Sequence, residues 1–385
     1  MGAAFTTIVG KRELPYARVL ADSLARVHPD LPLLVLLADE VEGAFDPDEE
    51  PFELVRLSEL AIPELPRVCF LHQPLSLSYA ATPFLLSALL DRGFDRVVFV
   101  KQESLVLGAQ RSVLEELEDA SVVLTPHLLA PPEDEDPAAR ERLILLSGSY
   151  NGGVVGVRRS EVAANFLAWW GDRVRLRCVH AVADGMHFEQ RWLDLAPVFF
   201  SRVRLLRDRR ANVGHWNLPE RSDLEPALLR FSGFDPRHPE WATRYSKRLA
   251  TRDLGNLEGR FHAYAEALCD AGWDEARSWP YAYGRFANGV PIPDLARELY
   301  ARTDPDRFPD PFRTGGGSFY TWLNEPQPGG RATRLWHAVY DRRPDVQAAF
   351  PDPSADGFLA WTEVSGLAEH GIDAAFLPAD LGSLA

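Results

Sequence analysis

The sequence predicts an α/β fold with a mixed, mainly parallel sheet flanked by helices and followed by a helical C-terminal region. Short β-branched runs alternate with helical patterns through the first half of the chain, and this alternation is typical of βαβ units. With 46% hydrophobic and 25% charged residues, the composition is that of a globular protein with ample material for a core. Beyond residue 245 the pattern becomes mostly helical.

The predicted elements follow one another in a regular order. Strands are expected over residues 5–9, 33–37, 97–100 and 122–124, and helices over residues 15–27 and 84–90. An acidic, proline-rich stretch at residues 131–136 predicts a solvated loop, and further strands and helices are expected over residues 143–206. We therefore expect an α/β domain over residues 1–245 and a helical region over residues 246–385 packed on it, interrupted by a proline- and glycine-rich segment at 303–330.

Charge and cysteine content exclude several classes of protein. The net charge of −15, from 41 basic and 56 acidic residues, argues against a nucleic-acid partner or an anionic membrane surface, since both need an extended basic patch. Three scattered cysteines, Cys69, Cys178 and Cys269, form neither a disulfide framework nor a zinc-ligand pattern. The N-terminus lacks a signal-peptide pattern, and no apolar run approaches the roughly 20 residues of a transmembrane helix. A cytoplasmic protein is expected.

Polar residues follow the predicted strands where ligands bind in open α/β sheets, at the carboxyl ends. The tripeptide Lys101-Gln102-Glu103 comes directly after the strand at 97–100. Taken alone, such a tripeptide also fits an ordinary strand end with solvated charges. The loop after the second strand adds Asp39 as a further candidate near the same edge.

Two later motifs add polar and glycine residues. In SGSYNGGVVGV, Asn151-Gly152-Gly153 precedes a valine-rich strand, and glycine lets a backbone approach a ligand closely. The purely structural interpretation is a tight turn that leads into the strand. In ADGMHFEQRWLDLAP, Glu189 and Gln190 supply a carboxylate and an amide, which also fit a helix start with an exposed glutamate.

In number and order, these segments resemble those of bacterial GT-A type nucleotide-sugar glycosyltransferases, and the chain looks family-8-like. Residues 83–107 resemble the helix and strand that end in the DxD triplet, and YNGG resembles "YNxG". The stretches FEQRWLDLAP, NVGHWNL and LLRFSGFDP resemble "DQxWLDLAP", "NVAYWNL" and "FHFSGFDP". Two C-terminal stretches, YAYGRFANG and RPDVQAAFPD, extend the resemblance over nearly the full chain.

The resemblance implies a GT-A (Rossmann-like) enzyme of the hexosyltransferase type. Such an enzyme moves a sugar from a nucleotide-sugar donor to an acceptor hydroxyl, on a glycan or a small natural product, and retention of anomeric configuration is expected. In the family the end of the first strand holds the base and ribose, which here points to Thr7, Ile8 and Val9. The same resemblance places the sugar at Asn151, Gly152 and Gly153. Glu189 and Gln190 would orient the acceptor, act as base or shield positive charge at the anomeric carbon.

This sequence departs from the family at its metal ligands. The first acid of the DxD triplet is Lys101, only Glu103 remains at its end, and Arg230 replaces the histidine that completes the metal site. Lysine and arginine can stabilise a departing nucleoside diphosphate as a cation would. We therefore expect no cofactor and no divalent metal, with Lys101 and Arg230 catalytic beside Glu189 and Gln190. His215 is expected either to pack or to face the phosphates.

Two alternatives stay open at this stage. The chain could be a catalytically silent glycosyltransferase-like protein that binds a nucleotide or glycan, or that serves as a scaffold for a partner enzyme. A degenerate site could also hydrolyse a sugar nucleotide. The sugar, the base and the acceptor depend on a few side chains whose geometry the sequence does not give.

Overall fold

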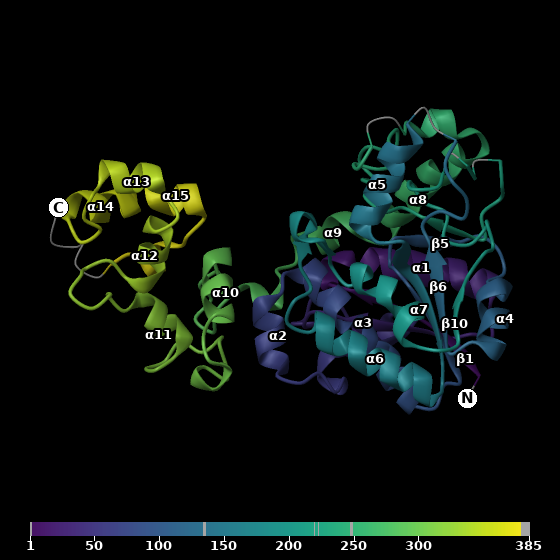
Figure 1. The fold of residues 1–385 in the computed structure, drawn as a ribbon, viewed down its shortest axis with the longest axis horizontal. Helices are drawn as coiled ribbons and strands as arrows, with labels where there is room; N and C mark the ends of the chain where they lie inside the picture. Colours follow the sequence, from purple (N-terminus) through teal and green to yellow (C-terminus); the bar gives the residue numbers. More distant parts are fainter. Residues whose placement is uncertain (1, 134–135, 219, 222, 247–248, 379–385) are drawn as a thin grey trace. The chain divides into compact units, whose positions relative to one another are not determined.

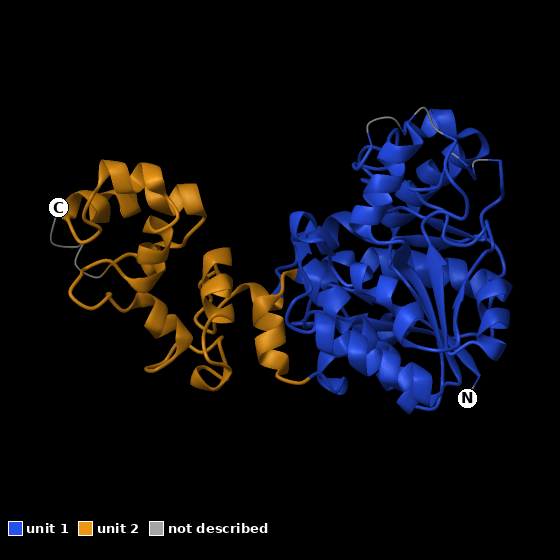
Figure 2. Ribbon diagram, in the orientation of Figure 1, with its two compact units in different colours: residues 1–62, 74–281 blue, residues 63–73, 282–385 orange. Residues whose placement is uncertain are grey.

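The computed structural model describes residues 2–133, 136–218, 220–221, 223–246 and 249–378, and the chain divides into two compact units (Figure 2). Unit 1 comprises residues 1–62 and 74–281, and unit 2 comprises residues 63–73 and 282–385. Across the described part of the chain, no helix is both long and apolar enough to cross a membrane.

The strands lie in unit 1, and seven of them form one sheet in the order β10-β6-β7-β4-β1-β2-β3. In this sheet β7 runs antiparallel to both of its neighbours, and the other neighbouring pairs are parallel. The predicted mixed, mainly parallel sheet is thus confirmed. The bounds are β1 (Ala3–Val9), β2 (Leu33–Leu37), β3 (Glu53–Arg56), β4 (Arg96–Val100), β5 (Ser104–Val106), β6 (Val122–Pro126), β7 (Tyr150–Arg158), β8 (His180–Ala181), β9 (Met186–His187), β10 (Val203–Leu205) and β11 (Leu228–Arg230).

The helices of unit 1 flank the sheet, and unit 2 is helical, as predicted for the C-terminal region. Unit 1 contains α1 (Leu14–Val27), α3 (Pro74–Asp91), α4 (Arg111–Asp119), α5 (Pro137–Ser147), α6 (Glu161–Val174), α7 (Ala196–Phe199), α8 (Glu258–Asp270) and α9 (Trp273–Ser278). Unit 2 contains α2 (Leu65–Leu71), α10 (Asp294–Ala301), α11 (Phe319–Asn324), α12 (Arg334–Tyr340), α13 (Pro344–Ala349), α14 (Asp356–Trp361) and α15 (Leu367–His370).

In unit 1 the strand side chains point alternately to the two faces of the sheet, and a layer of helices covers each face. Phe5 of β1 and Val98 of β4 share a buried cluster with Leu20 of α1 and Leu117 of α4. The residues that alternate with these along β1 and β4 point to the other face of the sheet, where α3 contacts β1 and β4. Helices α3 and α6 lie side by side in this second layer (Figure 1). The sheet is therefore buried on both faces, as its near-continuous apolar strands require.

The strand order places a ligand-binding edge beside β4. In the order 3-2-1-4 the direction of strand succession reverses between β1 and β4, and the crevice outside the carboxyl ends at such a point is where open α/β sheets bind ligands. A short ribbon follows β4, because β5 pairs antiparallel with β11 and sets Ser104 opposite Arg230. The Phe231 amide also donates to the Glu103 carbonyl at 2.8 Å. This ribbon brings Arg230 to the end of β4.

Unit 1 continues beyond the predicted boundary at residue 245 as far as residue 281. The reason is a second core in which Phe231 and Phe234 pack against Phe261 and Tyr264 of α8, with the rings of Phe231 and Tyr264 stacked at 3.7 Å. The described residues of the predicted loop at 131–136 are neither helix nor strand, and residues 134 and 135 lie outside the described residues.

Candidate functional site

Four charged side chains gather at the carboxyl end of β4. The Lys101 Nζ lies 2.9 Å from Oε1 of Glu189, and Nη2 of Arg230 lies 2.8 Å from Oε1 of Glu103. The side chains of Glu189 and Arg230 are 1% and 2% exposed, and those of Lys101 and Glu103 are 10% and 13% exposed. The structure thus brings together the two predicted cations, and each is paired with a buried carboxylate of its own.

The guanidinium of Arg230 is held from several sides. Its Nη1 donates to Oδ1 of Asn151 at 3.4 Å and to Oδ1 of Asn212 at 3.3 Å, and its backbone amide donates to the Val213 carbonyl at 2.7 Å. The Nδ2 of Asn212 in turn donates to Oδ1 of Asn151 at 3.2 Å. Among the described residues, Nε of Arg230 has no hydrogen-bond partner. The sequence showed Asn212 as part of a motif but did not identify it as a member of this network.

The glycines of the Asn151-Gly152-Gly153 motif make room for these charged side chains. A Cβ on Gly153 would overlap Nη1 of Arg230 and lie 2.6 Å from its Cζ. A Cβ on Gly152 would lie 2.6 Å from Oε1 of Glu189. The close neighbours of both glycines are therefore side chains of the protein itself. The predicted contact of these glycines with a donor sugar stays a prediction.

Glu189 and Gln190 have different surroundings. Gln190 uses both ends of its amide, because Oε1 accepts from the Gly152 amide at 2.8 Å and Nε2 donates to the Ser147 carbonyl at 2.8 Å. Glu189 contacts Lys101 as an ion pair without a well-aligned hydrogen bond, and its buried Oε2 has no partner in the described part of the chain. Of Glu189 and Gln190, only Glu189 has a side-chain oxygen without a hydrogen-bond partner there.

Electrostatics at the cluster favour a charged Glu103. Burial alone would raise the pKa of this carboxyl, but Arg230 and Lys101 outweigh burial and lower the pKa below its ordinary value. The ring of Tyr79, on α3, lies 3.7 Å from Nζ of Lys101. Burial, reinforced by Glu103 and Glu189, raises the pKa of Tyr79 well above its ordinary value, so its phenol stays neutral. Tyr79 was not among the predicted site residues, and no sequence motif indicated it.

The ends of β1 and β2 form the neighbouring part of this edge. Ile8 and Val9 are buried in the core, and Thr7 is completely buried with a hydroxyl that bonds to none of the described residues. Asp39 accepts from the Glu40 amide at 2.9 Å and lies 3.9 Å from Nζ of Lys11. Lys11, which the sequence analysis missed, is completely buried. Its position just after the first strand was the available signal.

Glu13 connects the two parts of the edge. Its pKa is raised by burial, and Glu103 and Asp39 raise it further, although the Gly10 amide, which donates to Glu13 at 2.8 Å, lowers it. Both Glu103 and Asp39 must therefore lie within electrostatic reach of Glu13. The predicted residues Thr7 and Asp39 belong to the same strand-end region as the charged cluster.

The histidines of this region are neutral near pH 7. Burial and the nearby Arg230 lower the pKa of His215 to about 4, and its ring packs against Trp216 and Tyr245 with centroids 5.2 and 5.4 Å apart. In the free protein His215 therefore packs as a neutral ring, and its phosphate-facing role stays a prediction. His127, which the sequence analysis missed, is buried with Nε2 3.1 Å from Nδ2 of Asn151, and burial lowers its pKa to about 3.

His127 predicts acid destabilisation of the fold. Its folded pKa of about 3 lies below the unfolded value near 6.5. Between these two pH values the histidine is protonated in the unfolded state and neutral in the folded state. Stability is therefore full above about pH 6.5 and falls as the pH drops towards 3, by about 2 kcal/mol at pH 5. Urea unfolding at pH 7 and pH 5 checks this: between these two pH values the parent should lose about 2 kcal/mol more unfolding free energy than His127→Gln. The control His238→Gln, which replaces an exposed histidine, should lose as much as the parent. Equal pH dependence in all three proteins would contradict the assignment.

The described residues offer little for a metal ion. No group of three or more His, Cys, Asp or Glu side chains among them is arranged to hold one. At the end of β4, the two carboxylates that could serve as ligands, Glu103 and Glu189, each contact a cation instead. The residues present do not fit the metal site that the DxD pattern implies.

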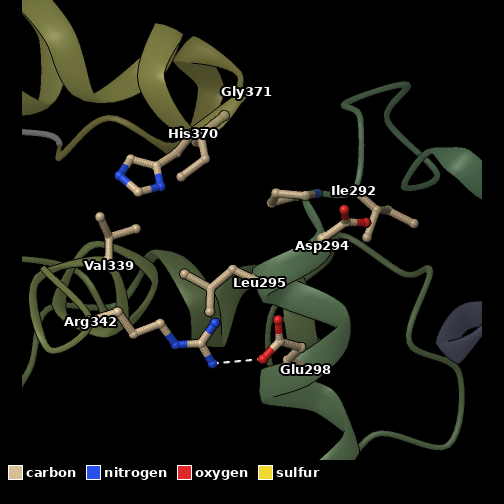
Figure 3. A pocket seen from close by; sticks show the side chains of 10 residues that line it. Ile292, Asp294, Leu295, Glu298, Val339, Arg342, His370 and Gly371 are labelled. Carbon is tan, nitrogen blue, oxygen red and sulfur yellow. Dashed lines mark hydrogen bonds and ion pairs between the residues drawn. The ribbon is translucent and has the colours of Figure 1, made fainter. Parts of the chain in front are cut away.

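Two cavities of about 450 Å³ lie apart from the predicted residues. One belongs to unit 2, where α10 and α12 approach the end of α15, and Arg342 donates to Glu298 across it at 2.7 Å (Figure 3). The other belongs to unit 1 and is lined by the Arg18–Glu50 ion pair and by the stacked rings of Phe45 and Trp279. None of the predicted catalytic or donor-binding residues lines either cavity.

Comparisons with known proteins return glycosyltransferases among solved structures. No protein-family model matches the chain. The uncharacterised protein YfnF of Bacillus subtilis (strain 168) is 25% identical over 230 residues, which are 56% of this chain and 73% of YfnF. The galactosyltransferase LgtC, solved with donor and acceptor sugar analogues, matches with a TM-score of 0.44 and 14% identity over 69% of this chain and 96% of LgtC. The apo form of the glycosyltransferase GlyE of Streptococcus pneumoniae TIGR4 matches with a TM-score of 0.43 and 12% identity over 78% of this chain and 72% of GlyE.

Proposed function

We propose that this protein is a glycosyltransferase that moves a sugar from a nucleotide-sugar donor to an acceptor hydroxyl without a divalent metal. The observation that carries the proposal is the buried pair of cations, Lys101 and Arg230, at the carboxyl end of β4 beside the point where the strand order reverses. The ordered sequence motifs that resemble GT-A glycosyltransferases support it. The acceptor we propose is a glycan or a small natural product.

In this proposal the two cations hold the donor's diphosphate. The leaving nucleoside diphosphate gains negative charge as the sugar departs, and fixed cations in a site of low polarity stabilise that charge strongly. The fork of Arg230 can bind phosphate oxygens in bidentate geometry, and Lys101 adds a compact charge. The nucleoside would lie over Thr7 to Val9 with Asp39 beside it, next to the diphosphate.

Glu189 is the better candidate of the two predicted residues for contact with the sugar. Its Oε2 lacks a partner in the described structure and can shield positive charge at the anomeric carbon or accept the acceptor's proton. Gln190 instead ties the Gly152 amide to the Ser147 carbonyl. We therefore propose Gln190 as a positioning residue that fixes the backbone of the NGG segment.

Calorimetry with a panel of nucleoside diphosphates and sugar nucleotides, in EDTA and in Mn²⁺, tests this function. Lys101→Ala is expected to weaken diphosphate binding by about 10- to 100-fold, since hydrogen bonds to charged groups contribute about 1.5–3 kcal/mol, and to abolish sugar transfer. Binding in EDTA should equal binding in Mn²⁺. The control Arg252→Ala removes an equal charge from an exposed side chain and should bind as the parent does.

One observation favours a silent glycosyltransferase-like binding protein as the second candidate. Both cations are already neutralised by carboxylates, as in a site whose charges only fill space. Ligand binding that is unaffected by EDTA, with no transfer or hydrolysis of any sugar nucleotide, would favour this candidate. The absence of any nucleotide binding would contradict the transferase and the nucleotide-binding form of the silent protein, and would leave a glycan-binding protein or a scaffold for a partner enzyme.

A further inference from the structure

We propose that Tyr79 is the positioning residue of Lys101, and that its ring keeps the ammonium in place while Lys101 exchanges the Glu189 carboxylate for the donor's diphosphate. This inference rests on the proposed function. It adds a residue that neither the sequence motifs nor the comparisons assign, and it explains how a neutralised cation can still serve an anionic ligand.

The ammonium of Lys101 has two different partners in the free protein. One is Oε1 of Glu189 at 2.9 Å, and the other is the face of the Tyr79 ring, with its centroid 3.7 Å from Nζ. The carboxylate cancels the charge of Lys101, whereas the ring attracts the ammonium through its quadrupole and leaves its full charge available. A cation–π contact is strengthened when the ammonium is withdrawn from water, as it is here. The ring can remain a partner when a phosphate arrives, because it carries no negative charge that competes with the phosphate for the ammonium.

Exchange at Glu189 is physically reasonable because that ion pair is incompletely satisfied. The contact lacks a well-aligned hydrogen bond, and Oε2 of Glu189 has no partner within the described residues. A diphosphate placed beside the intact cluster would meet two carboxylates that cancel the charges of Lys101 and Arg230. Moving Lys101 from Glu189 to the diphosphate frees one of these two cations for the ligand and leaves Glu189 uncovered for the sugar.

The Tyr79 ring is itself fixed in position. The Phe188 ring contacts it nearly edge-on, with centroids 5.1 Å apart and an interplanar angle of 76°. Phe188 has a φ of +48°, which is uncommon for a residue with a side chain, and it directly precedes Glu189. Within α3, Pro83 lacks the N–H that would bond to the Tyr79 carbonyl. Tyr79 thus contacts Phe188, the neighbour in sequence of Glu189, whose carboxylate Lys101 leaves in the proposed exchange.

The chemistry of the ring suits this role. Burial, together with Glu103 and Glu189, raises the pKa of the Tyr79 phenol well above its ordinary value. The ring therefore stays uncharged and cannot neutralise Lys101. Phenylalanine offers a similar face without the hydroxyl, while leucine or methionine fills comparable space without a π system.

The test measures binding of UDP, GDP, ADP and CDP, and of the matching nucleosides, by calorimetry in EDTA. Tyr79→Phe should keep the diphosphate affinity within about 2-fold, and Tyr79→Leu and Tyr79→Met should weaken it by more than that, because without a ring face the ammonium is no longer held where the diphosphate binds. Nucleoside affinity should not change in any variant. Glu189→Gln should bind the diphosphate more tightly, because the competing carboxylate is gone.

A graded fluorination series at position 79 keeps the experiment decisive if the leucine and methionine variants do not fold. Each fluorine on a phenylalanine ring weakens its negative face with little change of shape, so the diphosphate dissociation constant should rise with each added fluorine. Unchanged affinity along this series, in a protein whose parent binds a diphosphate, would overturn the role of Tyr79 and leave the proposed function intact. If the parent binds no diphosphate, both the proposed function and the exchange are wrong.

Discussion

Replacing Arg230 by alanine is expected to eliminate diphosphate binding and to lower the free energy of unfolding by about 3–5 kcal/mol, the typical cost of breaking a buried ion pair. The substitution leaves the carboxylate of Glu103 without its 2.8 Å partner and removes the donor shared by Asn151 and Asn212. Urea unfolding gives the stability loss, and calorimetry in EDTA gives the loss of binding. The two measurements should change together, since the same guanidinium serves both.

Two matched variants distinguish the effect of losing the buried Arg230–Glu103 pair from the general effect of removing a positive charge. Arg260 pairs with Glu225 at 2.8 Å, but both side chains are about half exposed. Arg260→Ala should therefore cost at most about 1 kcal/mol. Arg230→Lys keeps the charge but lacks the planar fork, so it should restore stability only in part. A stability loss in Arg230→Ala no larger than that in Arg260→Ala would contradict the buried network.

The same pair has a signature in acid. The folded pKa of Glu103 lies below its ordinary value because Arg230 and Lys101 outweigh burial. A carboxyl of this kind stabilises the fold above its unfolded pKa, near 4.3, and this contribution disappears as the pH falls through the lower folded pKa. Arg230→Ala removes one of the two cations that lower the pKa of Glu103. Protonation of Glu103 in acid should therefore cost this variant less unfolding free energy than it costs the parent.

The sequence predicted the sheet better than it predicted the site. The strand at 33–37 has the bounds of β2, and the other predicted strands differ from β1, β4 and β6 by one or two residues, because each contains a short, mostly apolar run between helical patterns. The strand β3 is four residues long with one buried residue, and β5 is three residues long. Both are too short for a period to stand out.

The pairing of charges could not be read from the sequence. Lys101 and Glu189 are far apart in the chain, and so are Glu103 and Arg230, so no local spacing reveals that each cation has its own carboxylate. The resemblance to glycosyltransferases suggested two cations side by side but gave no partner for either. Tyr79 and His127 belong to no motif, and only the packing of distant elements places them around the strand ends. Lys11 follows the first strand directly, but its pairing with Asp39 cannot be read from the sequence.

Replacing Gly153 by alanine is expected to cost about as much as the loss of Arg230 itself. The new Cβ would overlap Nη1 of Arg230 and lie 2.5 Å from Oδ1 of Asn151. An exposed arginine would swing aside, but this guanidinium is buried and held by Glu103, Asn151 and Asn212. The clash should therefore break the network, destabilise the fold by about 3 kcal/mol or more and weaken diphosphate binding in calorimetry.

The double variant Gly153→Ala/Arg230→Ala distinguishes this clash from a backbone effect. If the overlap with Arg230 causes the damage, the two losses will not add, because residues in contact couple strongly, and the double variant should be about as stable as Arg230→Ala alone. Gly259→Ala is the matched control, since a Cβ there meets nothing within 4 Å and alanine favours the helix α8 by up to about 1 kcal/mol. Fully additive losses would show that Gly153 is required by its own backbone, and that Arg230 does not depend on it.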